Sequence, residues 1–400
     1  MKRVRLLLGL LVLAAGLLSP SSMPGIREQA QESDVRSLSR AAAEAKAAGE
    51  FEKALELYRL ALAQNPAWSE GWESLGILLA DRKEYVRARA AFENLVKLQP
   101  KSGDAWTLLG LCEFRMGQYD LAVGHLEKAR TFEIVDKTLL RLLYYYSAAV
   151  MILHGDFDTA QIRLLLLARE GVASDELMEA YGLAALRVAS LPGQEPPGLR
   201  TVVLEVGRLV ANTRHLSVTE ATAGFERLIA KYPSQPGLRY AYGEYLASHA
   251  LYAEACEAFK QEVNNSPQDA MARLQIATIQ SQQRNRPTEA LPLAEEAVKL
   301  APQLFASHFV LGRILLKLGE TDRAVKELET ATRQAPRSVM VHTTLLNAYN
   351  KANRKDDAAR EQETLKRLQR FEASLKGQGS DAVSETGPPA SKQARDLDVQ

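Results

Sequence analysis

The chain has 400 residues, and 46% of them are hydrophobic. Its 50 Lys and Arg residues nearly balance its 49 Asp and Glu residues, which leaves a formal net charge of +1 at pH 7. A near-neutral chain without a basic stripe is not typical of proteins that bind nucleic acid. We therefore expect no nucleic-acid partner.

A short apolar run near the N-terminus indicates a secretory signal peptide. Lys2, Arg3 and Arg5 precede the run from Leu6 to Leu18, whose 13 residues are fewer than the ~20 that a membrane-spanning helix needs. This pattern predicts a signal peptide over residues 1–22 and a linker over 23–34, so the protein is expected to be exported, to the periplasm or outside the cell. The alternative is an uncleaved segment that anchors the protein, and membrane contact is expected only in that case.

The next stretch repeats itself at a constant interval. The matched pairs are Trp72 and Trp106, Leu75 and Leu109, Gly76 and Gly110, Tyr85 and Tyr119, and Ala88 and Ala122. A fixed period of this length is typical of a solenoid of stacked helix pairs, because one unit cannot bury its apolar face alone. The glycines are expected where the two helices of a unit approach closely, and Gly117 where a helix ends in a left-handed residue.

The pattern Trp-x-x-Leu-Gly, followed by an aromatic residue, Ala and Pro, resembles that of the tetratricopeptide repeat (TPR). The resemblance implies an all-α, superhelical TPR-type solenoid of helix pairs, with about 8–9 units in two arrays and a degenerate middle. In this family the first helices of successive units line a concave groove that takes an extended or helical peptide.

The repeat signature divides the rest of the chain in order. The expected segments are an N-terminal TPR array at 35–174, an irregular helical segment with a Pro/Gly loop at 175–216, a C-terminal TPR array with a capping helix at 217–375, and a disordered tail at 376–400. The loop is predicted because three prolines and two glycines lie between Ser190 and Gly198. The unit at 270–304 carries one extra residue, which we place in its turn at Gln283–Pro287. The tail has almost no large apolar residues with which to form a core.

The sequence contains no pattern typical of a catalytic, cofactor or metal site. A phosphate-binding glycine loop, a G-x-S-x-G turn and an H-E-x-x-H helix are all missing. His308 and His342 occupy equivalent positions of adjacent units, but a zinc site needs three or four ligands. Cys112 and Cys256 lie several units apart and are expected to be buried rather than bridged. We therefore predict a non-enzymatic protein with no cofactor and no metal.

The TPR register, carried over from the family, predicts a peptide-binding groove in the second array. The candidate residues are Tyr240, Glu244, Gln275, Thr278, Gln282, Phe309, Arg313, Lys317, Asn347 and Lys351. Cations would attract an acidic segment, aromatic rings would anchor apolar side chains, and amides would bond an extended backbone. In the first array, Tyr144, Tyr145 and Tyr146 form either an aromatic platform in a groove or packing between units and over apolar neighbours.

These features together indicate an exported scaffold that binds another protein or a peptide through a concave groove. Two other functions fit the same residues. One is a membrane-tethered assembly factor that retains its N-terminal segment as an anchor. The other is the recognition subunit of an exported enzyme complex whose catalysis lies in another chain.

Overall fold

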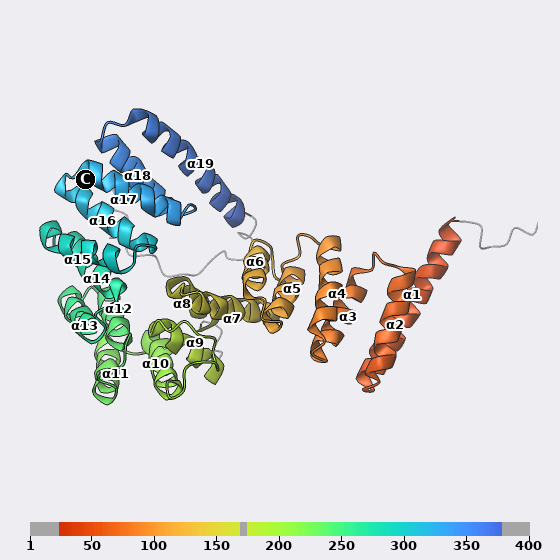
Figure 1. Cartoon of the computed structure of the whole chain (residues 1–400). Helices are drawn as coiled ribbons and strands as arrows, with labels where there is room; N and C mark the ends of the chain where they lie inside the picture. Colours follow the sequence, from red (N-terminus) through yellow and green to blue (C-terminus); the bar gives the residue numbers. More distant parts are fainter. Residues whose placement is uncertain (1–23, 169–173, 378–400) are drawn as a thin grey trace, which may run out of the picture. The chain divides into compact units, whose positions relative to one another are not determined.

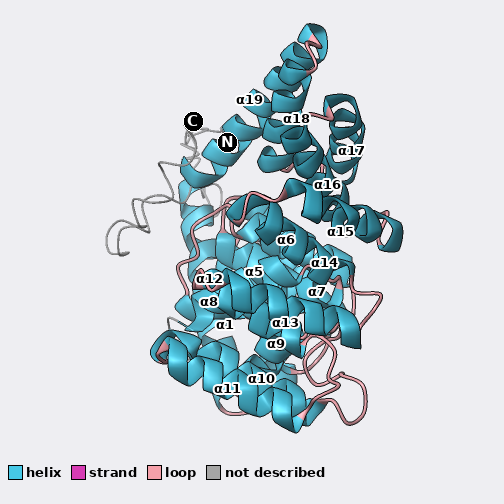
Figure 2. Cartoon of the chain, turned by 90° about the vertical axis from the view of Figure 1, so that its left-hand side faces the viewer, coloured by secondary structure: helices cyan, strands magenta, loops and turns pink. Residues whose placement is uncertain are grey.

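The computed structural model describes residues 24–168 and 174–377, and over these residues the chain consists of helices and connecting loops (Figures 1 and 2). Contacts divide it into two compact units, with the boundary between Lys101 and Ser102. The predicted signal peptide at 1–22 and most of the predicted tail lie outside the described residues. Among the residues that are described, no helix has both the length and the apolar character needed to cross a membrane.

The first unit contains two helix pairs. Its helices are α1 (Pro24–Ala47), α2 (Phe51–Gln64), α3 (Ser69–Asp81) and α4 (Tyr85–Leu98). Helix α1 packs on α2 and α3 packs on α4, and α2 also contacts α3. Because α1 begins at Pro24, the stretch expected as a linker at 23–34 is helical from that residue on, which differs from the prediction.

The second unit continues the same arrangement. In chain order it begins with α5 (Gly103–Arg115), α6 (Tyr119–Ala129), α7 (Lys137–Leu153), α8 (Phe157–Ala168), α9 (Asp175–Ala185), α10 (Arg200–Asn212) and η2 (Thr213–His215). The remaining helices are α11 (Val218–Lys231), α12 (Leu238–Ser248), α13 (Tyr252–Asn265), α14 (Ala270–Thr278), η3 (Ile279–Gln283), α15 (Pro287–Leu300), α16 (Phe305–Leu318), α17 (Thr321–Gln334), α18 (Val339–Lys351) and α19 (Lys355–Gly377). Consecutive helices pack as pairs, except that α11 lies between α10 and α12.

Many helices begin at residues that can satisfy the free N–H groups of a first turn. The side chains that accept from these N–H groups belong to Ser102, Asp136, Ser174, Ser217, Asp269 and Ser338. Ser217 and Glu220 form a complete capping box at the start of α11. The apolar faces of the paired helices then supply the core, in which many of the fully buried residues are alanine.

The close approaches expected at the repeated glycines are present. A Cβ atom on Gly76 would lie 2.4 Å from the Phe92 ring, and one on Gly110 would lie 2.9 Å from the Leu126 side chain. The first and second helices of these two units therefore pack with no room for a larger side chain at these positions. This confirms the role predicted from the repeat spacing.

The turn inside each unit needs a left-handed residue, and the same position supplies it in successive units. Gly49, Lys83 and Gly117 all have φ between 61° and 76°, and each lies one repeat after the one before it. Asn285 fills the position in the longer unit at 270–304. There the extra residue is accommodated in the π-helix η3, at the end of the first helix, rather than wholly in the turn that follows.

The middle of the chain is a continuous core and not a break between arrays. One hydrophobic cluster includes buried residues of every helix from α7 to α12, among them Leu164, Tyr181, Val203 and Phe225. Helix α10 packs tightly along α9, so α10 is the partner of α9, and α11 is an added helix. The two compact units meet at Lys101, whereas the sequence predicts that the two arrays are separated by the segment at 175–216. The fold class itself, an all-α solenoid of helix pairs, is confirmed.

Candidate functional site

The predicted groove residues lie on the first helices of four consecutive pairs. Helix α12 carries Tyr240 and Glu244, α14 and η3 carry Gln275, Thr278 and Gln282, α16 carries Phe309, Arg313 and Lys317, and α18 carries Asn347 and Lys351. The structure brings most of these residues into two separate polar clusters.

The first cluster joins three of the candidates. The Gln275 amide donates hydrogen bonds to the Tyr240 hydroxyl at 3.2 Å and to Glu244 Oε1 at 2.5 Å. Burial and, to a lesser degree, the charge of Asp158 raise the pKa of the Glu244 carboxyl to about 7, while Arg187 opposes both effects. Arg187 itself pairs with Asp158 at 3.2 Å. This cluster has its own polar partners, and Glu244 is only partly ionised near neutral pH.

The second cluster surrounds the π-helix. Lys317 Nζ donates to the Ser281 carbonyl at 2.6 Å, and the Arg313 guanidinium lies 5.4 Å from the centre of the Phe309 ring. When the side-chain amide of Gln282 is oriented with its oxygen towards Arg313, this oxygen accepts a hydrogen bond from Arg313 Nη1 at 3.0 Å. Burial lowers the pKa of both cations, and the charge of Arg313 lowers that of Lys317 further.

The aromatic candidates of the second array differ from the expectation. The Tyr240 side chain is 2% exposed and the Phe309 side chain is 4% exposed. Both rings are therefore packed inside the solenoid and are not free to anchor a partner. Asn347 and Lys351 are exposed, and Thr278 is half-buried.

A hollow of about 650 Å³ lies where the end of the first array meets the segment at 175–216. Side chains from α5, α6, α7, α8 and α9 line it, together with the loop between α9 and α10. Its volume lies within the range of sites that take small molecules or single large side chains. The residues that characterise it are Phe114, Arg115, Tyr119, Tyr145, Tyr146 and Pro192.

Four aromatic rings of the hollow contact one another. The Phe114 ring centre lies 4.6 Å from that of Tyr146 and 5.3 Å from that of Tyr119. Tyr145 and Tyr146 meet edge to face at 5.1 Å. Burial raises the pKa of the Tyr145 hydroxyl, which keeps it neutral. The rings form a wall that exists before any ligand arrives.

The two alternatives for the tyrosine triplet each hold for part of it. Tyr144 and Tyr145 pack against the core cluster of α7 to α12. Tyr145 and Tyr146 line the hollow. Tyr144 thus packs against the core, Tyr146 lines the hollow, and Tyr145 does both.

The loop between α9 and α10 is attached to the fold at two points. Leu191 is 5% exposed, and the Glu195 side chain is 4% exposed. Glu195 lies beside Glu179 of α9, and burial together with the charge of Glu195 raises the pKa of Glu179, while Arg200 lowers it. Gln194 is exposed and lines the hollow.

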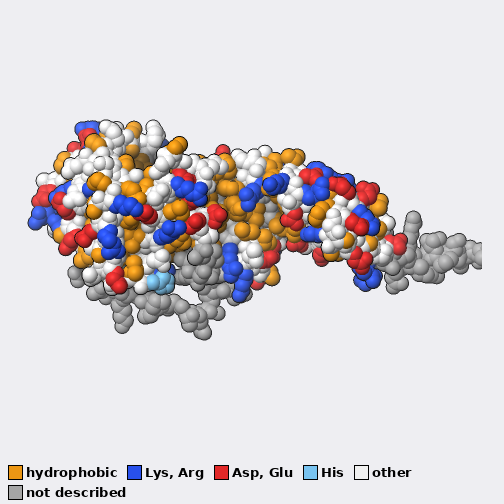
Figure 3. Space-filling model, turned by 90° about the horizontal axis from the view of Figure 1, so that it is seen from below, with side chains coloured by type: hydrophobic (Ala, Val, Ile, Leu, Met, Phe, Trp, Pro, Cys, Tyr) orange, Lys and Arg blue, Asp and Glu red, His pale blue; other side chains and the backbone are white. Residues whose placement is uncertain are grey.

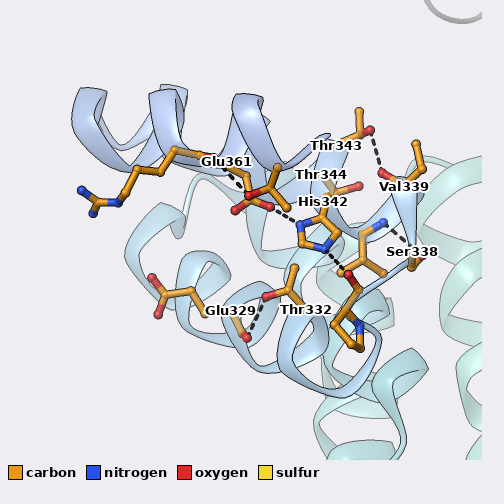
Figure 4. Close-up of polar contacts among 12 residues, drawn as sticks. Glu329, Thr332, Ser338, Val339, His342, Thr343, Thr344 and Glu361 are labelled. Carbon is orange, nitrogen blue, oxygen red and sulfur yellow. Dashed lines mark hydrogen bonds and ion pairs between the residues drawn. The ribbon is translucent and has the colours of Figure 1, made fainter. Parts of the chain in front are cut away.

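Each of the two equivalent histidines forms one bond within its own unit and one to the preceding unit. One ring nitrogen of His308 contacts Glu327 at 2.6 Å, and His342 contacts Glu361 of α19 in the same way (Figure 4). The other nitrogen faces the carbonyl of the proline six residues earlier, at 2.9 Å for His308 and 3.1 Å for His342. Each ring thus holds the start of a first helix to the end of the preceding pair.

The same position serves the same purpose in the first array. Trp72 Nε1 donates to the carbonyl of Pro66, also six residues earlier, at 2.9 Å. Arg239 of α12 also donates from this position to the carbonyl of Pro233, six residues earlier, so tryptophan, arginine and histidine side chains can all make this bond. Over residues 24–168 and 174–377, no group of three or more His, Cys, Asp or Glu side chains is placed to hold a metal ion.

The TPR register also predicts Phe114, Arg115, Tyr145 and Tyr146 as groove residues of the first array, but it does not predict that they meet the Pro/Gly loop. The tyrosines and the Pro/Gly loop were both recognisable, but no spacing in the sequence connects them. They meet because α9 and α10 pack closely enough to bring Pro192 back towards α7. On the face that Figure 3 shows, basic and acidic side chains are interspersed.

Family models described as Tetratricopeptide repeat match residues 39–93, 85–133 and 281–346. None of the curated proteins matches the chain. Several solved structures are similar. A MamA double mutant (MamA RS-1 ArsTM) is 20% identical, covers 42% of this chain and 94% of its own, and has a TM-score of 0.39. MamA residues 41-end from Desulfovibrio magneticus RS-1 are 21% identical over 43% and 94% of the two chains, with a TM-score of 0.36.

YrrB, described as a TPR protein with an unusual peptide-binding site, is 17% identical over 43% and 88% of the two chains, with a TM-score of 0.36. Similarity of this degree carries no argument about function. Helix pairs repeat within the matched stretches and also between and around them. The chain therefore contains tetratricopeptide repeats over residues 39–133 and 281–346, and its described residues have an all-α fold of packed helix pairs.

Proposed function

We propose that the protein is an exported, non-enzymatic scaffold that binds a segment of a partner protein in the aromatic hollow lined by α5 to α9 and the loop between α9 and α10. The observation that carries this proposal is the preformed hollow of about 650 Å³ with four contacting rings. Aromatic side chains in such hollows are the residues that most often dominate binding energy. The buried rings of the second array, Tyr240 and Phe309, offer no comparable surface.

Export is supported by the basic and apolar pattern at residues 1–22. We expect the mature protein to begin near Ser19–Ser22, because the polar residues that follow Leu18 are where cleavage would occur. N-terminal sequencing of protein purified from its native host measures this directly. A mature chain that still begins at Met1 and fractionates with membranes would support the anchored assembly factor instead.

Replacing Tyr146 by Ala is expected to weaken partner binding at least tenfold, because it removes the ring that contacts Phe114, Tyr145 and Arg115. The partner is first captured by a photo-crosslinking amino acid at Gln194, an exposed position that lines the hollow. Glu257, an exposed residue of α13 outside the hollow, is the control position. The dissociation constant of the captured partner is then measured for wild type, Tyr146→Ala and Tyr146→Phe.

Tyr146→Phe keeps the ring and is expected to stay much closer to wild type. Arg313→Ala with Lys317→Ala serves as the matched pair in the second array, and thermal melts of each variant report on folding. Weaker binding in that double variant, with Tyr146→Ala unchanged, would place the site in the second array and contradict the proposal.

A further inference from the structure

Arg115 is an exposed cation at the hollow, and its one hydrogen-bond partner among the described residues is neutral. Its Nη2 donates to the Tyr146 hydroxyl at 2.6 Å, and its guanidinium lies 5.3 Å from the centre of the Tyr146 ring. No carboxylate in the part of the chain that the structure describes forms an ion pair with it. The tyrosine therefore orients the charge without neutralising it.

Other arginines at the surface are satisfied differently. Arg82, at the end of α3, pairs with Glu52 at 2.6 Å and with Glu84 at 3.0 Å. Arg323 pairs with Glu295 at 2.7 Å and also with Glu320. A guanidinium has five N–H donors, and most of those of Arg115 remain available to an incoming acceptor.

The charges that line the hollow favour an anion. Arg115 and Arg141 are the two cations and Glu176 the one carboxylate among the described residues that line it, and Arg141 already has an interaction of its own. Glu179, whose charge also acts on Tyr145, is paired with Arg200, so Arg115 is the cation that an incoming anion would meet. Planar guanidinium groups pair with carboxylates through two parallel hydrogen bonds. A carboxylate held beside Arg115 would be partly shielded from solvent, so its attraction would be screened less than on an open surface.

The walls of the hollow favour an aromatic side chain beside that carboxylate. Phe114, Tyr119 and Tyr146 present ring faces and edges, and ring pairs contribute more than the area that they bury. We infer that the hollow takes an aromatic side chain of an extended partner segment in which a neighbouring residue is Asp or Glu, and that Arg115 pairs with this carboxylate. The inference rests on the proposed function, since it specifies the partner of the same site.

Short peptides of defined composition test this chemistry on the full chain. The probes are C-terminally amidated pentapeptides, each with an N-terminal dye: Gly-Asp-Trp-Asp-Gly, its Asn counterpart Gly-Asn-Trp-Asn-Gly, and Gly-Asp-Ala-Asp-Gly. Dissociation constants come from fluorescence anisotropy at low ionic strength, with unlabelled peptide as competitor. The Asp/Trp probe is expected to bind about fivefold more tightly than the Asn/Trp probe, the size of one partly exposed ion pair. The Asp/Ala probe is expected to bind most weakly.

Variants of Arg115 identify the source of this preference. Arg115→Gln is expected to remove the difference in affinity between the Asp/Trp and Asn/Trp probes. Arg115→Lys is expected to retain part of this difference, because lysine keeps the positive charge but lacks the paired N–H donors of the guanidinium. Arg323→Gln makes the same change in net charge on α17 and is expected to leave the difference intact. Thermal melts establish that each variant is folded.

The possible failures separate the inference from the proposed function. Equal binding of the Asp/Trp and Asn/Trp probes to wild type would overturn the acidic preference and leave the hollow as a site for aromatic side chains. Equal binding of the Trp and Ala probes would overturn the aromatic preference. If no probe bound, or if Tyr146→Ala left the affinities of all probes unchanged, the hollow would not be the binding site. The proposal that the partner binds in the hollow would then be wrong.

Discussion

Replacing Gly207 by Ala is expected to lower the free energy of unfolding by at least about 3 kcal/mol. A Cβ atom on Gly207 would lie 1.8 Å from the carbonyl oxygen of Met178 in α9. Gly182 of α9 is in the same situation, because its Cβ atom would lie 1.9 Å from the carbonyl oxygen of Val203. The two helices thus meet backbone to backbone, and no side-chain rotation can relieve the contact.

Gly207→Ala is expected to destabilise the protein, whereas replacing an ordinary helical glycine by alanine stabilises it. Glycine inside a helix usually destabilises it by about 1 kcal/mol relative to alanine, so Gly→Ala normally stabilises. Gly124 of α6 supplies the matched control, because a Cβ atom there would meet nothing within 4 Å. Gly124→Ala is expected to raise stability by about 0.5–1 kcal/mol.

Urea unfolding followed by circular dichroism measures both variants. Because repeat proteins can unfold in steps, hydrogen exchange of the α9 and α10 amides locates the loss. In Gly207→Ala the exchange should increase first in these two helices and in the hydrophobic cluster from α7 to α12. Similar stabilities for Gly207→Ala and Gly124→Ala would show that α9 and α10 do not pack this closely.

The regular units were predictable because their determinants are local and repeated. Gly76 and Gly110 occur at the same position of adjacent units, and each faces the second helix of its own unit. The turn residue recurs in the same way, so the constant spacing of the repeat was sufficient to locate it. A deviation of one residue was also visible in the sequence, although the π-helix that accommodates it was not.

The site was less predictable because it depends on contacts between units. Register places Tyr240 and Phe309 on the correct helices, but it does not show that the packing of neighbouring elements covers them. Arg187, for example, lies 5.0 Å from the centre of the Tyr240 ring, although helices α10 and α11 separate the two residues in the sequence. The hollow required the pairing of α9 with α10, where the TPR pattern falters.

Glu244 is expected to make the protein less stable as the pH rises towards neutrality. Burial is the main cause that raises the pKa of this carboxyl from 4.5 to about 7, and the negative charge of Asp158 adds to it. Between these two pH values the folded protein keeps a proton that the unfolded chain has lost. The free energy of unfolding therefore falls as pH rises through this window, by up to about 3 kcal/mol, and the loss is complete above pH 7.

Glu244→Gln should remove this dependence. Its amide oxygen can still accept the hydrogen bond from Gln275, but no charge is buried when the pH rises. The variant is expected to match wild type near pH 5 and to be more stable by up to about 3 kcal/mol near pH 8, as measured by urea unfolding at both values. Glu257→Gln, at an exposed position of α13, is the control and should change stability little at either pH. If the gain from Glu244→Gln were the same at both pH values, it would come from packing or hydrogen bonding, and the carboxyl would not be titrating in this range.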